Sequence, residues 1–356
     1  MSNVEPRWSP DWATHPGQHL EEYLEAREMS QAELARLTGL TPKLISTVVS
    51  GKNPVTPDTA LKLERVLGLK ADTWLSLQSR FDLHVAQSAE SSVPQEFLSL
   101  FPIKELVARG VLPAKEKASE LGNALLSFLG IGSPGVLATR IEGLCVRHRQ
   151  SAKAKSSPEH VLSWLLLGET RARKMNVGPF SADKFQFALS EIRKLTVLPP
   201  EKFQGRMVEL CREAGVALVF EPPISKTFVY GSARWFDNDR ALIQMSLRMK
   251  FNDHFWWTFF HEAGHIVLHR GKNFADDVTL DGDTFETEAN KFAQQLLVPN
   301  DSWNSFLSAH PNSKAKVEQF ARAIEIHPGI VVGMLQHHGV LKFSDLNGLK
   351  NRFDWA

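Results

Sequence analysis

The stretch Phe255-Trp256-Trp257-Thr258-Phe259-Phe260-His261-Glu262-Ala263-Gly264-His265 decides how the C-terminal half of this chain is interpreted. Its apolar residues predict a buried helix that carries the pattern H-E-x-x-H. At about 3.6 residues per turn, His261 and His265 project from the same face, one turn apart. Two neutral imidazoles placed in this way can each give a nitrogen to one Zn²⁺, while Glu262 lies beside them, free to act on water there. The pattern therefore predicts a zinc-dependent hydrolase.

The composition is that of a globular protein, with 43% hydrophobic and 23% charged residues in a chain of 356. That length is enough for two or three domains. Cys145 and Cys211 cannot form a disulfide framework, and neither belongs to a C-x-x-C pair, so we expect no sulfur ligands for zinc. The N-terminus lacks a signal-peptide run, and no apolar stretch reaches the ~20 residues of a membrane helix. We expect a cytoplasmic protein with no membrane segment.

Residues 15–80 show short amphipathic helices separated by tight turns. Ser30 with Glu33 three residues later is a capping box, which predicts a helix at Gln31–Thr38. After the turn residue Gly39, a third helix is expected from Pro42 to about Ser50, and a fourth at Pro57–Leu67. Two short helices joined by a glycine-containing turn form a helix-turn-helix, whose second helix enters the DNA major groove by its N-terminal end. Apolar residues of these helices are expected in the core: Leu34, Ala35, Leu37, Ile45 and Val48.

This module resembles the lambda-repressor-like helix-turn-helix family and is closest to its HigA-type antitoxin branch. The matching positions are Gln31, Leu34-Ala35, Gly39, Ile45-Ser46, Gly51 and Leu67-Gly68. Thr41, Lys43 and Ser46 stand at the exposed start of the second helix of the motif, where they would meet base edges. Gln31 and Lys52 sit where members of the family touch phosphates. The resemblance implies a homodimer that binds an inverted repeat in double-stranded DNA.

The charge of this region keeps a second interpretation open. Residues 1–75 contain eight Lys and Arg against ten Asp and Glu, a net charge of −2. Phosphate neutralisation supplies much of the affinity for DNA, so an acidic module is less favourable for binding. The alternative is a helical protein-interaction domain that has lost DNA binding.

Residues 81–199 contain no recognisable catalytic pattern, and we expect a helical middle region. The basic, Ser-rich segment Arg147–Lys155 is interpreted as a solvated helical face in preference to a hinge or phosphate contact. Cys145 is interpreted as a packed residue in preference to a redox sensor. Helical signals recur at Gln95–Leu100, Ile103–Arg109, Lys115–Leu129, Glu159–Lys174 and Ala182–Lys194.

Residues 200–345 change to a mixed helix and strand pattern. A strand is expected at Val216–Phe220, and a hairpin turns around Asp237-Asn238-Asp239. The H-E-x-x-H helix follows, and after an acidic loop at Asp276–Asp283 comes a helix at Thr287–Leu297. The chain as a whole is therefore predicted to be multidomain, with an all-α helix-turn-helix domain, a helical middle region and an α+β C-terminal domain.

A catalytic zinc normally takes three protein ligands and keeps the fourth position open. Glu288 is the expected third ligand, because it sits one turn into the helix that follows the acidic loop. Glu286 is two residues away and would face elsewhere, so both cannot bind one metal. His269 shares a face with His265 but is expected beyond the reach of the metal. The weaker choices are Asp276, Asp277, Asp281 and Asp283.

The C-terminal region resembles the ImmA/IrrE family of metallopeptidases, which are thermolysin-like gluzincins with a His, His, Glu zinc site. The resemblance runs from Gly231 through Arg248 to His265, then through Glu288-Ala289-Asn290-x-Phe292-Ala293 to Leu296-Leu297-Val298-Pro299, and it covers about residues 200–340. Carried over by position, it implies His261, His265 and Glu288 as zinc ligands and Glu262 as general base.

Two classes of function follow from these patterns. The first is a regulatory zinc metalloendopeptidase fused to its own DNA-binding module, which cleaves a repressor or antitoxin-like protein. The second is a HigA-like transcription regulator whose zinc fold is a non-proteolytic sensor or dimerisation domain. In the first, an extended substrate would add along a sheet edge near Ala241–Ser246. Tyr230 and the histidines between 327 and 338 are the candidates for stabilising the oxyanion.

Overall fold

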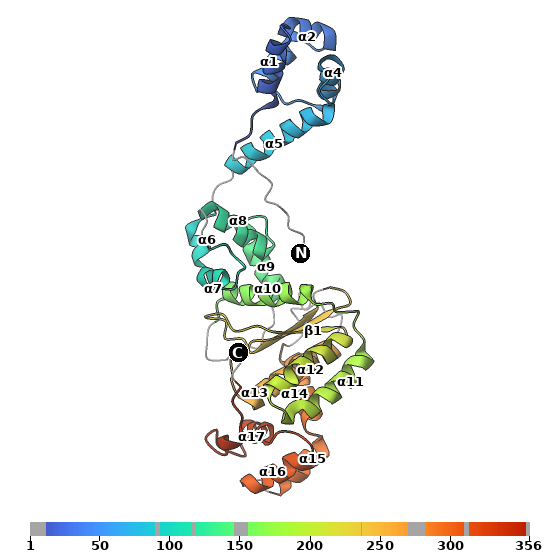
Figure 1. Cartoon of the computed structure of the whole chain (residues 1–356). Coiled ribbons are helices and arrows are strands. Elements are labelled where there is room, and N and C mark those ends of the chain that lie inside the picture. Colours follow the sequence, from blue (N-terminus) through green and yellow to red (C-terminus); the bar gives the residue numbers. More distant parts are fainter. Residues whose placement is uncertain are drawn as a thin grey trace. The chain divides into compact units, whose positions relative to one another are not determined.

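The computed structural model describes residues 12–89, 93–114, 118–145, 156–235, 237–269, 282–309 and 313–353. The chain divides into two compact units, 1–92 and 93–356 (Figure 1). The boundary lies later than the expected one at residue 80, because one more helix belongs to the first unit. The rest of the expected middle region belongs to the second unit together with the C-terminal domain.

The first unit is a bundle of five helices among the residues described there: α1 Pro16–Ala26, α2 Gln31–Thr38, α3 Pro42–Val49, α4 Pro57–Leu67 and α5 Ala71–Ala89. The predicted bounds of α2 and α4 are confirmed, because local capping defines them. The Ser30 hydroxyl accepts a hydrogen bond from the backbone N–H of Glu33 at 3.1 Å. Gly39 then ends α2 in the left-handed conformation, with φ of 69°.

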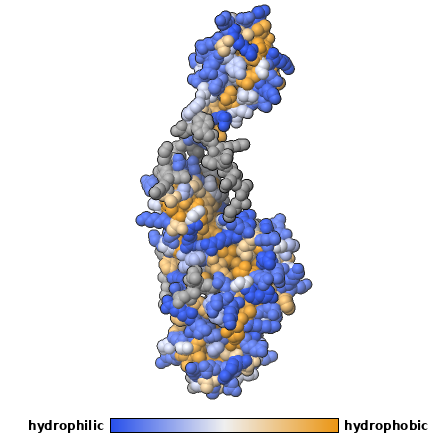
Figure 2. Space-filling model, in the orientation of Figure 1, coloured by the Kyte–Doolittle hydropathy of each residue, from blue (hydrophilic) through white to orange (hydrophobic). Residues whose placement is uncertain are grey.

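The core of this unit lies between the five helices and includes Leu34, Ile45 and Trp74, all fully buried. The expectation that Leu37 is also core was wrong, since 46% of it is exposed. The buried residues of α2 are Leu34, Ala35 and Thr38, and Leu37 lies about 100° around the helix from the middle of that face. Figure 2 shows the surface of this unit as hydrophilic with apolar areas between.

The second unit contains a three-stranded sheet of β1 Val216–Phe220, β2 Gly231–Trp235 and β3 Ala241–Met245 in the order β1-β3-β2. β1 pairs with β3 in parallel, and β2 pairs with β3 as an antiparallel hairpin. β3 is therefore the central strand, which corrects the expectation that Ala241–Ser246 lies at an edge. Within the described part of the chain, β1 and β2 are the outer strands of this sheet.

Each face of the sheet is covered by helices (Figure 1). Ala217, Val219 and Leu242 pack with residues of α10 Pro158–Lys174 on one face. The alternate strand residues, such as Leu218 and Ile243, face the larger core on the other side. That core is built by α11 Ala182–Lys194, α12 Pro200–Glu213 and α13 Asn252–Leu268, together with the C-terminal helices.

The end of β1 is tied to the middle region by a buried carboxylate. Glu221 is fully buried and pairs with Arg109, and its second oxygen lies 2.9 Å from Nε of Arg171 in α10. Burial raises the pKa of this carboxyl, although both arginines act to lower it. The indole N–H of Trp164 in α10 also donates to the Glu221 carbonyl at 3.1 Å.

The middle region contributes four further helices: α6 Gln95–Ser99, α7 Ile103–Ala108, α8 Ala118–Leu129 and α9 Leu137–Cys145. They pack against α10 in one apolar cluster. α9 was not expected, whereas the other predicted helices are present. One stretch, Glu120–Gly143, is long and apolar enough by composition to cross a membrane. It contains most of α8, Gly130 at φ of 65° and most of α9, and Leu125 and Leu129 in it are fully buried.

The chain closes with α14 Gly282–Leu297, α15 Asn300–Ser308, α16 Lys314–Ala323 and α17 Pro328–His337. α14 begins five residues before the predicted start at Thr287. The acidic loop before it lies outside the described residues, as do the basic segment 147–155 and the side chain of Cys145.

Candidate metal centre and helix-turn-helix surface

α13 carries three of the expected site residues on a helix that is anchored in the core. Its aromatic side chains Phe259 and Phe260 are fully buried. His261 and Glu262 are only 1% and 4% exposed, and the His265 side chain is 16% exposed. Because the apolar face fixes the helix against the sheet, the two histidines are held on the face that meets α14.

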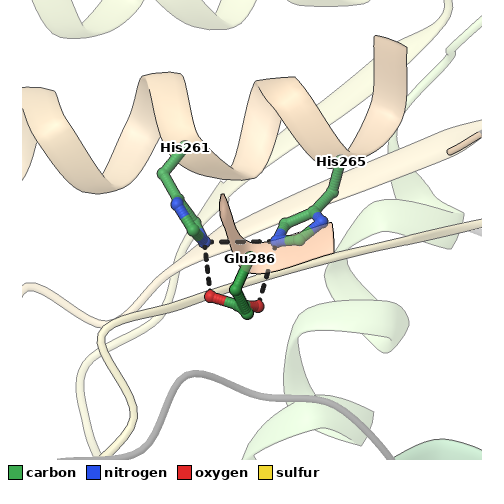
Figure 3. A group of neighbouring side chains, drawn as sticks. All are labelled: His261, His265 and Glu286. Atoms are coloured by element: carbon green, nitrogen blue, oxygen red, sulfur yellow. Dashed lines mark hydrogen bonds and ion pairs between the residues drawn. The ribbon is translucent and has the colours of Figure 1, made fainter. Parts of the chain in front are cut away.

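α14 brings a carboxylate to these histidines, and that carboxylate is Glu286 (Figure 3). One carboxylate oxygen of Glu286 lies 3.3 Å from Nε2 of His261, and the other lies 3.3 Å from Nε2 of His265. The two Nε2 atoms are 3.1 Å apart. A methyl group at Gly264 would sit 3.2 Å from Cα of Ala289, so the glycine lets α14 approach closely enough for this contact.

Glu288, the expected third ligand, faces His269 in this arrangement and not the pair His261 and His265. Glu288 is 49% exposed, and its oxygen lies 2.9 Å from Nε2 of His269. Residues two apart on a helix point about 200° from each other, so only one of the two glutamates can face the pair His261 and His265. Of the other carboxylates considered, Asp276, Asp277, Asp281 and the Asp283 side chain lie outside the described residues.

The donor atoms fit a metal ion. Nδ1 of His261 lies 3.1 Å from the side-chain oxygen of Asn290, an acceptor, which favours the tautomer with the proton on Nδ1. Its Nε2 then presents a lone pair towards Nε2 of His265 and a carboxylate, an unfavourable grouping unless a cation or an added proton lies between. Two atoms bound to one tetrahedral zinc at about 2.0–2.1 Å lie about 3.3–3.4 Å apart. The 3.1 to 3.3 Å separations match that spacing.

The protonation state of Glu286 also suits a role as a metal ligand. Burial by itself raises the pKa of this carboxyl. In the absence of a metal, an added proton on the facing imidazole nitrogens lets His261 and His265 donate hydrogen bonds and attract the carboxylate, and these interactions outweigh burial and hold the pKa well below its usual range. The group is therefore a carboxylate at neutral pH. A carboxylate with two imidazoles is the ligand set of a catalytic zinc with an open position.

Glu262 lies next to the edge strand of the sheet. A methyl group on Gly231, the first residue of β2, would be 2.9 Å from Cγ and Oε1 of Glu262 and 2.7 Å from Cγ2 of Thr258. The backbone of β2 therefore runs directly alongside the proposed base. The sequence signal for this contact was a glycine at the start of a predicted strand, which often marks close approach of another group.

Two hollows line α13 before His261. One, of about 110 Å³, lies between α13 and α17 and is lined by Asp253, His254, Trp257, Ile330, Gly333, Met334, His337 and His338. The second is smaller and is lined by residues that include Tyr230, Arg248 and Thr258. His327 borders neither, because its ring caps α17 by accepting from the backbone N–H of Gly329 at 3.0 Å.

In the first unit, the five expected DNA contacts all lie on exposed positions: Gln31, Thr41, Lys43, Ser46 and Lys52. Lys43 and Ser46 are three residues apart on α3, on the side away from the buried Ile45 and Val48. The Thr41 hydroxyl accepts from the backbone N–H of Leu44 at 3.2 Å, so it also caps α3.

Comparison with protein families matches two parts of the chain. Residues 20–74 match the helix-turn-helix family, and residues 215–332 match the family of the IrrE N-terminal-like domain. Both resemblances inferred from the sequence are confirmed, as is the fold class that they imply.

Individual relatives cover about a fifth of the chain. Virulence-associated protein I of Dichelobacter nodosus is 38% identical over 82 residues, which are 23% of this chain and 76% of that protein. The uncharacterised HTH-type transcriptional regulator YddM of Escherichia coli is 35% identical over 72 residues, 20% of this chain and 77% of that protein.

Among solved structures, a HigA-family addiction module antidote protein from Coxiella burnetii is 32% identical, covers 21% of this chain and 83% of its own, and has a TM-score of 0.20. The Pseudomonas aeruginosa antitoxin HigA with higBA promoter is 30% identical over 22% of this chain and 86% of its own, with a TM-score of 0.22. On the two family matches and the sequence identity to the Dichelobacter and Escherichia proteins, the chain belongs to the helix-turn-helix family of transcription regulators and carries an IrrE-like domain in its C-terminal unit.

Proposed function

We propose that this protein is a cytoplasmic, DNA-binding transcription regulator fused to a zinc metalloendopeptidase that cleaves a repressor or antitoxin-like protein. The observation that carries the proposal is the meeting of His261, His265 and Glu286, with Glu262 buried beside them. These residues lie within the part of the chain that matches the family of the IrrE N-terminal-like domain.

The roles of the residues follow from their positions. His261, His265 and Glu286 would hold the zinc ion through two Nε2 atoms and one carboxylate. When bound, the metal supplies a Lewis acid that polarises a carbonyl and makes water acidic at neutral pH. Glu262 accepts a proton from the attacking water on its carboxylate and returns that proton to the leaving amine.

The substrate would lie along β2. β2 is an outer strand of the sheet among the described residues, and its first residue, Gly231, lies directly against Glu262. An extended peptide that pairs with β2 through main-chain hydrogen bonds would therefore pass the proposed base. Tyr230 precedes Gly231 and lines the smaller hollow beside α13, which keeps it as a candidate for the oxyanion.

The DNA-binding role rests on the helix-turn-helix family and the exposed face of α3. We infer that two copies read an inverted repeat with half-sites about one helical turn apart. Exposed apolar side chains of this unit, such as Leu37, Leu61 and Leu83, give a second copy surface to cover.

The test compares the proteomes of cells that produce wild-type protein or the Glu262→Gln variant. The variant should keep about one zinc per chain, because Glu262 is not among the three ligands, and it should lose cleavage completely. A protein that is newly cut in wild-type cells and intact in variant cells is the expected result. The same cut in both would remove Glu262 from the mechanism. No cut in either, with zinc bound, would favour the non-proteolytic sensor or dimerisation domain.

A further inference from the structure

We propose that His269 and Glu288 form a relay that positions the proposed zinc ligand His265. This inference rests on the proposed metal centre. Nδ1 of His265 lies 3.0 Å from Nδ1 of His269, and Nε2 of His269 lies 2.9 Å from a carboxylate oxygen of Glu288. His265 of α13, His269 directly after that helix and Glu288 of α14 thus form one continuous chain of hydrogen bonds away from the proposed metal position.

The positions of the protons follow from the acceptor at the end of this chain. A carboxylate can only accept, so His269 carries its proton on Nε2 and leaves Nδ1 as an acceptor. His265 must then donate from its own Nδ1, which leaves Nε2 with a lone pair. That Nε2 is the atom that faces Glu286 and His261. Glu288 therefore selects, through His269, the tautomer of His265 that can bind a metal.

The surroundings of His269 fix this geometry. The side chain is only 1% exposed, and its ring packs edge-on against Phe285 with centroids 4.7 Å apart. Phe285 and Glu288 both belong to α14, so the helix that supplies the third ligand also holds the relay. His261 has no intervening residue of this kind, because its Nδ1 contacts the side chain of Asn290 in α14 directly.

Glu288 allows a clean test because its side chain is half exposed, so truncation leaves no internal cavity. Glu288→Ala removes the acceptor. Glu288→Gln keeps a carbonyl oxygen that can still accept from His269. Lys291→Ala alters an exposed residue of the same helix and is the matched control. Glu286→Gln changes a proposed ligand and shows how far zinc affinity falls when a ligand itself is lost.

The measurement is zinc affinity of the full-length protein, by competition with a chromophoric chelator, together with the melting temperature of each metal-free variant. Loss of an outer partner of a ligating histidine typically weakens metal binding by about 10–100-fold. We expect about a tenfold loss for Glu288→Ala, a smaller loss for Glu288→Gln and none for Lys291→Ala, with melting temperatures unchanged. The Co²⁺ form of Glu288→Ala should keep an intense, tetrahedral visible spectrum whose maximum is shifted.

The outcomes separate the relay from the metal centre itself. Wild-type protein that binds no zinc would overturn the proposed function, and the relay with it. Wild-type protein that binds zinc while Glu288→Ala binds equally well would overturn the relay alone. A loss in Glu288→Ala as large as that in Glu286→Gln would make Glu288 a ligand and would also overturn the relay.

Discussion

The helix-turn-helix surface and the metal centre place their functional side chains in opposite surroundings. Lys43 and Lys52 are exposed, and affinity for DNA is a sum over many such contacts. His261 is buried, and its ring is held from both nitrogens by Glu286 and Asn290. Losses at the first surface should therefore be graded and salt-dependent. At the metal centre, one atom in the wrong place should remove the whole activity.

The largest effect is expected for Glu286→Gln, because one of the three proposed ligands changes from a carboxylate to a neutral amide. Zinc content after dialysis should fall from about one per chain to nearly none, a loss of affinity of at least about 100-fold, more than for an outer partner. Elemental analysis of Glu286→Gln and Glu288→Gln side by side checks this. Depletion of zinc in Glu288→Gln alone would restore the original assignment of the third ligand.

A smaller effect is expected for Gly231→Ala. The added methyl group overlaps Oε1 and Cγ of Glu262, so the carboxylate must shift while the zinc ligands stay in place. Misplacing a catalytic group by about 1 Å can cost about 100-fold in rate. We expect a drop of at least about tenfold in the cleavage found for wild type, with zinc content unchanged. Full activity would show that β2 does not fix the position of the base.

At the helix-turn-helix surface, Lys43→Ala combined with Ser46→Ala should reduce the protein's discrimination between specific and random DNA. Each good base contact contributes about 1–3 kcal/mol of discrimination, so a loss of about tenfold or more is expected. Fluorescence anisotropy of the full-length protein against genomic fragments and a scrambled duplex measures this. If wild type shows no selectivity even at low salt, the first unit is a protein-interaction domain.

The smallest effect is expected for Lys52→Ala. Loss of one phosphate contact should weaken specific and random DNA alike by a few-fold. It should also reduce the slope of log affinity against log salt by about 0.9. The same titrations, repeated at several salt concentrations, measure the slope. An unchanged slope would place Lys52 away from the phosphates.

The sequence predicts most reliably where the cause is local. Ser30 and Gly39 mark the ends of α2 through contacts within a few residues, and the predicted bounds are confirmed. The order of the strands depends on pairing between distant segments, so the central place of β3 could not be read from Ala241–Ser246. Leu37 was misplaced for a related reason, because an eight-residue helix buries only the side that its neighbours cover.

The position of Glu286 opposite the two histidines was within reach of the sequence. Ala289, Ala293 and Leu297 recur every fourth residue and form the fully buried stripe of α14. Glu286 is three residues before Ala289 and continues that stripe towards α13, whereas Glu288 is only one residue before it. The predicted start of the helix at Thr287 was five residues too late, which removed Glu286 from the helical pattern. The relay through His269 could not be predicted, since it depends on the packing of two helices.

The buried pairing of Glu221 with Arg109 and Arg171 bears on how this protein can be divided. The IrrE-like match begins at residue 215, yet β1 is fastened to partners that lie before residue 175. A fragment that begins at residue 215 would lack α10, which covers one face of the sheet. It would also leave the buried Glu221 without Arg109 and Arg171. The smallest fragment expected to fold intact is therefore the whole second unit, from residue 93 onwards, and the middle region is a structural part of the domain that carries the proposed site.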